Sequence, residues 1–189
     1  MQKYGSDARG AAPRLVLLIA GLLVVVAGLL VWLMVIPEPP AVAGMAHSDQ
    51  PGMNAGGDGL ARLGGAGPLL FWLQAAILLL IHAMVALGVT PARRNTTFWA
   101  LLAAICLVSL GVWWGMYESY VEYLRSGETA LVFGYPLATA LALFGVPFGG
   151  ALLCLLYVLG FRRFVYTSED EAAYEAFRAH SGPARIPER

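Results

Sequence analysis

Residues 15–36 read LVLLIAGLLVVVAGLLVWLMVI and contain no charged side chain. A helix of about 20 apolar residues crosses the hydrocarbon core of a bilayer, which is ~30 Å thick. Three further runs have the same character, at 69–89, 98–117 and 135–161. The sequence of 189 residues therefore predicts an all-α integral membrane protein with four transmembrane helices, one at each run.

The more polar segments between the runs predict how the helices are connected. The first connection is long and rich in Gly, Ala and Pro, which predicts an external loop without a core of its own. The second is short, so the two helices that it joins should form an antiparallel hairpin. The third mixes charged residues with tyrosines, which is typical of a helix that continues past the membrane surface. With the two terminal segments, the expected divisions are 1–14, 37–68, 90–97, 118–134 and 162–189.

The basic residues predict the orientation, because Lys and Arg in short loops stay on the cytoplasmic side. Ten of the 12 lie before the first run, between the second and third, or after the fourth. The two exceptions are Arg62 and Arg125. We therefore expect both termini in the cytoplasm. The formal net charge of zero hides a strong charge asymmetry between the two faces of the membrane.

An alternative for the N-terminus is a cleaved signal peptide, because Ala41-Val42-Ala43 has the small-x-small pattern of a cleavage site. The apolar region of a signal peptide is ~7–15 residues long, however, and the run at 15–36 is longer. Pro39 and Pro40 also crowd the cleavage point. We therefore expect a retained helix.

The tail after residue 161 predicts a short cytoplasmic helix. Ser168 and Glu171 have the spacing of a capping box, in which the serine accepts a backbone N–H and the glutamate reaches back. Tyr174 and Phe177 lie three residues apart and form one aromatic ridge. This helix either rests its ridge on the membrane surface or docks on a partner protein.

Intramembrane polar groups are costly and are therefore candidates for function. Gln74 and His82 lie in the second run, and no Asp, Glu, Lys or Arg lies inside any run. His82 is a possible haem ligand or proton relay, but a bis-histidine haem needs a second membrane histidine, and His47 and His180 lie outside the runs. A hydrogen bond between helices is the simpler interpretation of His82, and we expect no haem.

A group of potential copper ligands lies in the first connection, where Met45, His47, Asp49 and Met53 are close in sequence. A Gly-rich loop supplies no rigid frame for them, so we expect neither a metal site nor a cofactor. Cys106 and Cys154 lie within membrane runs and belong to no metal or redox motif. A small thiol packs well in such a helix.

Glycines at helical spacing predict close helix packing. Gly111 and Gly115 lie four residues apart in the third run, and Gly145 and Gly149 in the fourth, with Pro147 between them as a predicted kink. A stripe of small residues on the first helix has a similar character and comprises Ala20, Gly21, Ala27 and Gly28. These faces pack within the bundle or against another subunit.

The sequence contains no nucleophile beside a base, no phosphate-binding glycine loop, no paired membrane carboxylates and no cysteine cluster. An enzyme is therefore not expected, nor is a nucleic-acid partner. One histidine inside the membrane is also little for a carrier that acts alone. An accessory, anchoring or assembly role remains, with a larger integral membrane protein and membrane lipid as the expected partners.

The second half of the chain resembles the small subunits of bacterial sodium:solute symporters over about 80 residues. The similar features are Arg93-Arg94-Asn95, the segment Phe133-Gly134-Tyr135-Pro136-Leu137, and Phe161-Arg162-Arg163-Phe164 with the acidic tail. Those subunits have two helices with both ends cytoplasmic, whereas this chain has an additional N-terminal helix pair and a Gly-rich loop. The resemblance implies a multi-pass protein of the bacterial plasma membrane.

Our leading hypothesis is a non-catalytic accessory subunit of a secondary transporter, with its partner contacts at the glycine faces and at Tyr174 and Phe177. The alternative is a small anchor or assembly subunit of a respiratory electron-transfer complex, where His82 or the Met45/His47/Met53 loop touches a cofactor held by other chains. A freestanding structural protein is a third possibility.

Overall fold

The computed structural model describes residues 4–37, 45–47, 49–55 and 59–181. The described chain is mostly helical, as predicted, and four of its helices are long and apolar enough to cross a membrane. The apolar stretches are Arg14–Val35, Leu63–Leu87, Thr96–Ser126 and Leu137–Val165.

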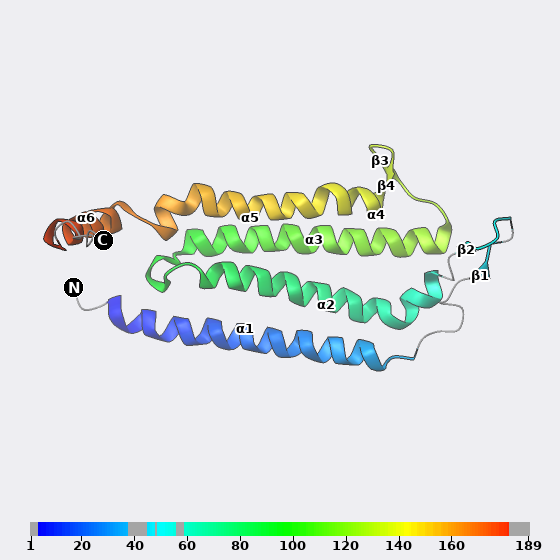
Figure 1. The fold of residues 1–189 in the computed structure, drawn as a ribbon, viewed down its shortest axis with the longest axis horizontal. Helices are drawn as coiled ribbons and strands as arrows, with labels where there is room; N and C mark the ends of the chain where they lie inside the picture. The colour runs from blue at the N-terminus through cyan, green and yellow to red at the C-terminus, as the bar shows by residue number, and fades with distance from the viewer. Residues whose placement is uncertain (1–3, 38–44, 48, 56–58, 182–189) are drawn as a thin grey trace, which may run out of the picture.

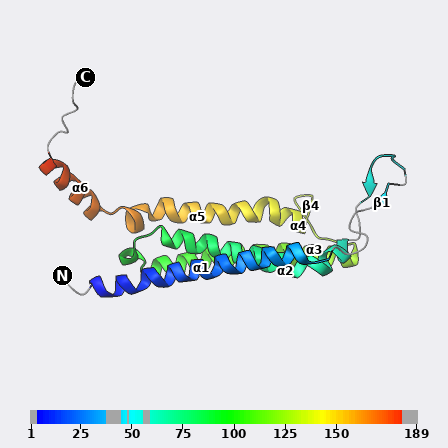
Figure 2. The same cartoon turned by 60° about the horizontal axis from the view of Figure 1, so that its bottom comes forward.

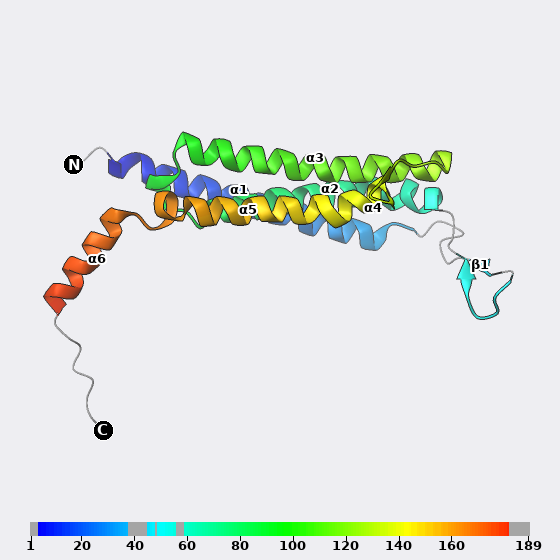
Figure 3. The ribbon, with the colours of Figure 1, turned by 90° about the horizontal axis from the view of Figure 1, so that it is seen from above.

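The membrane helices pack in the order of the chain. Helix α1 (Tyr4–Val35) packs on α2 (Gly59–Leu87), and α2 packs on α3 (Thr96–Ser126). The fourth helix packs on α3 and consists of α4 (Leu137–Ala140), η2 (Leu141–Gly145), α5 (Val146–Gly160) and η3 (Phe161–Val165). Figure 1 shows the four side by side, with α3 between α2 and α5, and Figure 3 shows α3 offset from the others.

The start of α1, the turn between α2 and α3, and α6 (Ser168–Ser181) all lie at one end of the bundle (Figure 1). Two short hairpins lie at the opposite end. Helix α6 leaves the bundle axis, as Figures 2 and 3 show. Because every connection reverses the chain direction, the segments that are rich in basic residues fall at one end of the bundle. This placement agrees with the alternation of basic segments along the sequence.

The turn between α2 and α3 contains a short 3-10 helix, η1 (Pro91–Arg93). Asn95 then caps α3, because its Oδ1 accepts the N–H of Phe98 at 2.9 Å. Phe98 is almost completely buried and belongs to the main apolar core. That core joins all four membrane helices and comprises Leu15, Ile19, Ala83, Ala86, Val89, Phe98, Leu102, Leu156 and Phe164.

The first connection is shorter than predicted, because α2 begins at Gly59 and includes Pro68. The reason is the length of α3, which continues to Ser126 and supports these additional turns. A Cβ on Gly59 would lie 2.7 Å from a methyl group of Leu124, so the two helices approach closely there. Within the same connection, β1 (Met45–Ala46) pairs with β2 (Asn54–Ala55) as an antiparallel hairpin.

The third connection contains a second hairpin that the sequence did not predict. The extension of α3 past the membrane run is confirmed. The helix ends at Ser126 and is capped by Gly127, whose φ of 73° is left-handed. Strands β3 (Leu131–Val132) and β4 (Tyr135–Pro136) then pair through a two-residue turn. Phe133 and Gly134 both have positive φ, 53° and 81°, as a type I′ turn requires.

A π-helical turn, η2, precedes Pro147 in the fourth helix. Proline has no N–H to donate, and its ring clashes with the carbonyl four residues earlier. The wider turn over Leu141–Gly145 accommodates both effects. Where the sequence predicted a kink at Pro147, the structure shows a local change of helix type just before it.

Candidate functional site at one end of the bundle

Arg93, in the turn between α2 and α3, joins three segments of the chain. Its guanidinium donates to the carbonyl of Val165 at 2.5 Å and to the carboxylate of Asp170 at 2.6 Å, with a longer contact of 3.4 Å to Thr167 Oγ1. Hydrogen bonding to Arg93 lowers the pKa of Asp170 from 3.8 to about 2. The same bond raises the pKa of Arg93. The ion pair therefore attaches the start of α6 to the membrane bundle.

The predicted capping box at Ser168 and Glu171 is wrong by one residue. Asp170 Oδ2 accepts the backbone N–H of Thr167 at 2.9 Å, so the reciprocal contact belongs to Thr167 and Asp170. Glu171 instead pairs with Arg162 at 2.6 Å. The register shifts because the attachment to Arg93 fixes Asp170, and the spacing of residue types alone does not reveal that long-range contact.

The aromatic ridge of α6 is exposed. Tyr174 and Phe177 are 60% and 70% exposed, respectively. The helix carries three acidic residues in its first turn and Arg178 with His180 in its last, an arrangement that suits the helix dipole. A charged helix with two exposed rings is thus held at a fixed point beside the bundle.

Two other arginines lie at the same end without a carboxylate partner among the residues that the structure describes. Arg94 donates from Nε to the carbonyl of Val89 at 2.8 Å and from Nη2 to that of Leu87 at 3.4 Å, so it caps α2. Burial lowers the pKa of Arg94. Arg163 lies over the Phe164 ring, with its guanidinium carbon 5.4 Å from the ring centre. We call the end that carries Arg93, Arg94, Arg162 and Arg163 the arginine end.

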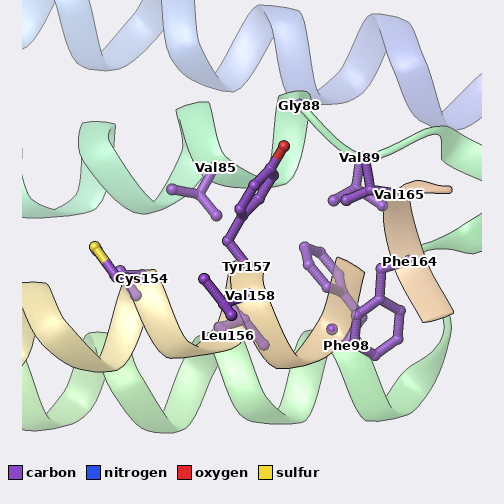
Figure 4. A pocket seen from close by; sticks show the side chains of 12 residues that line it. Val85, Gly88, Val89, Phe98, Cys154, Leu156, Tyr157, Val158, Phe164 and Val165 are labelled. Atoms are coloured by element: carbon purple, nitrogen blue, oxygen red, sulfur yellow. The ribbon is translucent and has the colours of Figure 1, made fainter. Parts of the chain in front are cut away.

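A cavity of about 430 Å³ lies between α2 and α5 beside the arginine end. Figure 4 shows Val85 of α2, Val89 of the turn that follows α2, and Tyr157 of α5 reaching into this space, with the rings of Phe98 and Phe164 near its end. Except for Tyr157 and Cys154, every lining residue is apolar or glycine. The lining residues are Val85, Gly88, Val89, Phe98, Leu153, Cys154, Leu156, Tyr157, Val158, Gly160, Phe164 and Val165.

The structure separates the predicted glycine pairs by what each one contacts. Gly145 and Gly149 face α3, because a Cβ at Gly145 would lie 2.7 Å from Val112 Cγ1 and one at Gly149 would lie 3.1 Å from Ser109 Oγ. Gly115 faces the fourth helix through Leu141, at 3.3 Å. A Cβ at Gly111 would meet nothing within 4 Å among the described atoms. These contacts place Gly145, Gly149 and Gly115 inside the bundle.

The small-residue stripe of α1 points away from the rest of the described chain. Ala20, Gly21, Ala27 and Gly28 are all exposed. A Cβ at either glycine would also meet no described atom within 4 Å. Of the predicted glycine faces, this stripe and Gly111 are therefore open to lipid or to another protein.

His82 is 4% exposed, and its two ring nitrogens differ. Nδ1 lies 2.8 Å from the carbonyl of Leu78 in the same helix, which assigns the proton to Nδ1. Nε2 is buried and has no hydrogen-bond partner among the described residues. The bond between helices that we expected of His82 is therefore replaced by a bond within α2. Gln74, two turns earlier, is half-buried.

The Met/His group of the first connection is arranged around the β1–β2 hairpin. His47 Nδ1 accepts the backbone N–H of Asp49 at 3.2 Å, so this nitrogen already has a partner. Met53 donates its N–H to Gln50, and its carbonyl accepts from His47. The part of the chain that the structure describes contains no cluster of three or more His, Cys, Asp or Glu side chains that could bind a metal.

Sequence reasoning missed the link between Arg93 and Asp170, 77 residues apart. Arg93 had been interpreted as a basic loop residue and as part of the Arg93-Arg94-Asn95 resemblance, and Asp170 only as part of the acidic tail. The available signal was that a short basic turn and an acidic helix start fall at the same predicted membrane face.

Comparison with protein-family models, curated proteins and solved structures finds no match to this chain.

Proposed function

We propose that this protein is a non-catalytic accessory subunit of a larger integral membrane protein, a bacterial secondary transporter of the sodium:solute symporter type. In this proposal the arginine end faces the cytoplasm of a bacterial cell, in accordance with the distribution of basic residues. Helix α6 is the contact with the partner. The chain itself needs no catalytic group for this role.

The observation that carries the proposal is the attachment of α6. A helix that merely rested on lipid would need no fixed direction, yet Arg93 bonds both Asp170 and the carbonyl of Val165 just before α6 begins. The attachment leaves Tyr174 and Phe177 largely exposed. Aromatic side chains provide much of the binding energy of protein interfaces because they bury large areas with few rotatable bonds.

The α1 stripe supports a second contact within the membrane. Apolar side chains gain nothing by leaving lipid for another apolar helix, so close backbone approach is a main source of helix association there. The α1 stripe offers such an approach, whereas Gly145 and Gly149 are already covered by α3. We therefore expect the partner to contact both the α1 stripe and the exposed rings of α6.

Recovery of the partner from native membranes tests this function. The double variant Tyr174→Ala/Phe177→Ala should insert normally, because it changes no membrane residue, but should recover at least about tenfold less partner, since the loss of an aromatic hot spot costs 2 kcal/mol or more. The matched control is Glu175→Ala/Arg178→Ala, which shortens two neighbouring α6 side chains without changing the net charge. If both variants recovered as much partner as the unaltered protein, α6 would be refuted as the contact.

His82 favours a second candidate, the anchor or assembly subunit of a respiratory complex. Histidine ligands of metals commonly donate one ring N–H to a carbonyl and keep the other nitrogen for the metal, and His82 has this arrangement. Its Nε2 is enclosed by the packed helices, so a haem would require α2 to move away from its neighbours. A Soret band that is lost in His82→Ala would favour this candidate over the transporter subunit.

A further inference from the structure

We propose that the cavity between α2 and α5 is a binding site for an anionic phospholipid, with one acyl chain in the cavity and the phosphate at Arg94 and Arg163. This site is separate from the proposed partner contact on α6. Three features of the arginine end support it: the chemistry of the lining, the position of the arginines and their remaining charge.

The lining suits an acyl chain. Its volume of about 430 Å³ lies within the usual range of ligand sites, about 300–1,000 Å³. Ten of its 12 lining residues are apolar or glycine, and Tyr157 and Cys154 are the others. Figure 4 shows the Tyr157 hydroxyl directed toward Gly88. A polar ligand would find few hydrogen bonds in this space, whereas a hydrocarbon chain would find continuous contact.

The arginines contact residues that line the cavity. Arg94 bonds the carbonyl of Val89, Arg93 bonds that of Val165, and Arg163 covers the ring of Phe164. Guanidinium groups therefore contact residues of the lining, and a lipid whose chain entered the cavity could place its headgroup beside them. Basic pockets between membrane helices on the cytoplasmic side are a recognised form of anionic lipid site.

The charge at the rim is only partly neutralised. Arg93 pairs with Asp170, and Arg162 pairs with Glu171. Arg94 and Arg163 have no carboxylate partner among the described residues, and Arg163 makes only a 3.4 Å contact with Thr97 Oγ1 besides its contact with Phe164. These two positive charges favour an anionic lipid headgroup over a zwitterionic one. An apolar helix of a partner protein carries no negative group that could pair with them.

Native mass spectrometry of the full-length protein tests this site. The protein is mixed with equal amounts of phosphatidylglycerol and phosphatidylcholine that carry identical acyl chains. We expect an excess of phosphatidylglycerol adducts that falls about fivefold for each arginine removed in Arg163→Gln and Arg94→Gln/Arg163→Gln. Arg125→Gln, at the opposite end of α3, removes one charge and should preserve the excess.

A second variant tests the cavity itself. Gly88 lines the cavity, and a Cβ there would make only ordinary contacts, the shortest 3.5 Å to the carbonyl of Val85. Gly88→Leu should therefore fold, as an unchanged unfolding temperature would confirm, and should lower the phosphatidylglycerol adducts at least fivefold. Arg163→Gln keeps the test decisive if the loss of the Arg94 cap unfolds the double variant.

Several results would overturn the lipid site. Equal binding of the two lipids, or an excess that survives both Arg163→Gln and Gly88→Leu, would exclude it. Displacement of phosphatidylglycerol by inorganic phosphate would indicate a simple anion site. If Gly88→Leu lowered recovery of a partner protein without changing the lipid adducts, the cavity would hold a partner's helix.

Discussion

At the scale of single residues, Asp170 links the fold to pH. Its pKa is about 2 in the folded chain and ordinarily 3.8, so the bond to Arg93 stabilises the attached position of α6 fully above about pH 4. This contribution is lost as pH falls through about 2. Spin labels at Ala92→Cys and Glu175→Cys, with Cys106 and Cys154 replaced by Ala, should therefore give one narrow distance distribution from neutral pH to about pH 4.

Asp170→Asn should broaden that distribution from neutral pH to about pH 4, because it removes the charge that Arg93 binds. Glu169→Gln is the matched control, since Glu169 makes no hydrogen bond to Arg93 in the described structure. A narrow distribution in Asp170→Asn would mean that α6 is positioned by something other than this ion pair.

His82 provides a second prediction at this scale. A buried acceptor without a partner costs about 1–3 kcal/mol, and the carbonyl of Leu78 keeps its helical bond without the imidazole. His82→Leu should therefore raise the thermal unfolding temperature in detergent, whereas His180→Leu, on the exposed part of α6, should leave it unchanged. A lower unfolding temperature in His82→Leu would show that Nε2 has a stabilising partner.

At the scale of elements, the contact between the fourth helix and α3 depends on Gly145. A leucine there would meet Val112, and overpacking of this kind typically costs about 1–3 kcal/mol. Gly145→Leu should therefore unfold at a lower temperature. Gly150→Leu is the matched control on the same helix, because a Cβ there would meet nothing within 4 Å.

Compensation makes this prediction specific. Gly145→Ala should destabilise the protein, and Val112→Ala in the same chain should restore much of the loss by clearing the clash. Strictly additive destabilisation by the two changes would show that Gly145 does not pack on Val112.

Whether an element could be predicted depended on how far apart in sequence the residues that determine it lie. Hydropathy predicted the four membrane helices, because it reports transfer into lipid and needs no tertiary contact. The start of α2 at Gly59 depends on Leu124, and the cap at Thr167 depends on Arg93, both distant in sequence. The hairpin turn at Phe133 was missed because a phenylalanine with positive φ is unfavourable by about 1–2 kcal/mol and gives no turn signal. Its ring lies 5.5 Å from that of Phe144, a contact that sequence spacing does not reveal.

The candidate site was predictable in part for the same reason. Tyr174 and Phe177 were recognised from their spacing and are exposed. The glycine spacing predicted close packing without indicating the neighbour, and the structure assigns Gly145 and Gly149 to α3. The cavity between α2 and α5 is formed by residues from four separate segments, so no local pattern indicated it.

At the scale of the whole molecule, the orientation in the membrane is a direct prediction. The arginine end should face the cytoplasm, and the β3–β4 hairpin should face the opposite side. In a variant without Cys106 and Cys154, an impermeant thiol reagent added to whole cells should label Thr129→Cys and should not label Ala92→Cys. The reverse pattern would invert the topology and remove α6 from the cytoplasm.

The central claim is that α6 contacts a larger membrane protein, and photo-crosslinking in intact cells of the native source tests it most directly. A photoreactive phenylalanine analogue replaces Tyr174 in one strain and Glu118, at the far end of α3, in a second strain as the control. We predict that Tyr174 crosslinks to one multi-spanning transporter and that Glu118 does not give this product. Crosslinks from Tyr174 to lipid alone, or to respiratory subunits, would contradict the account.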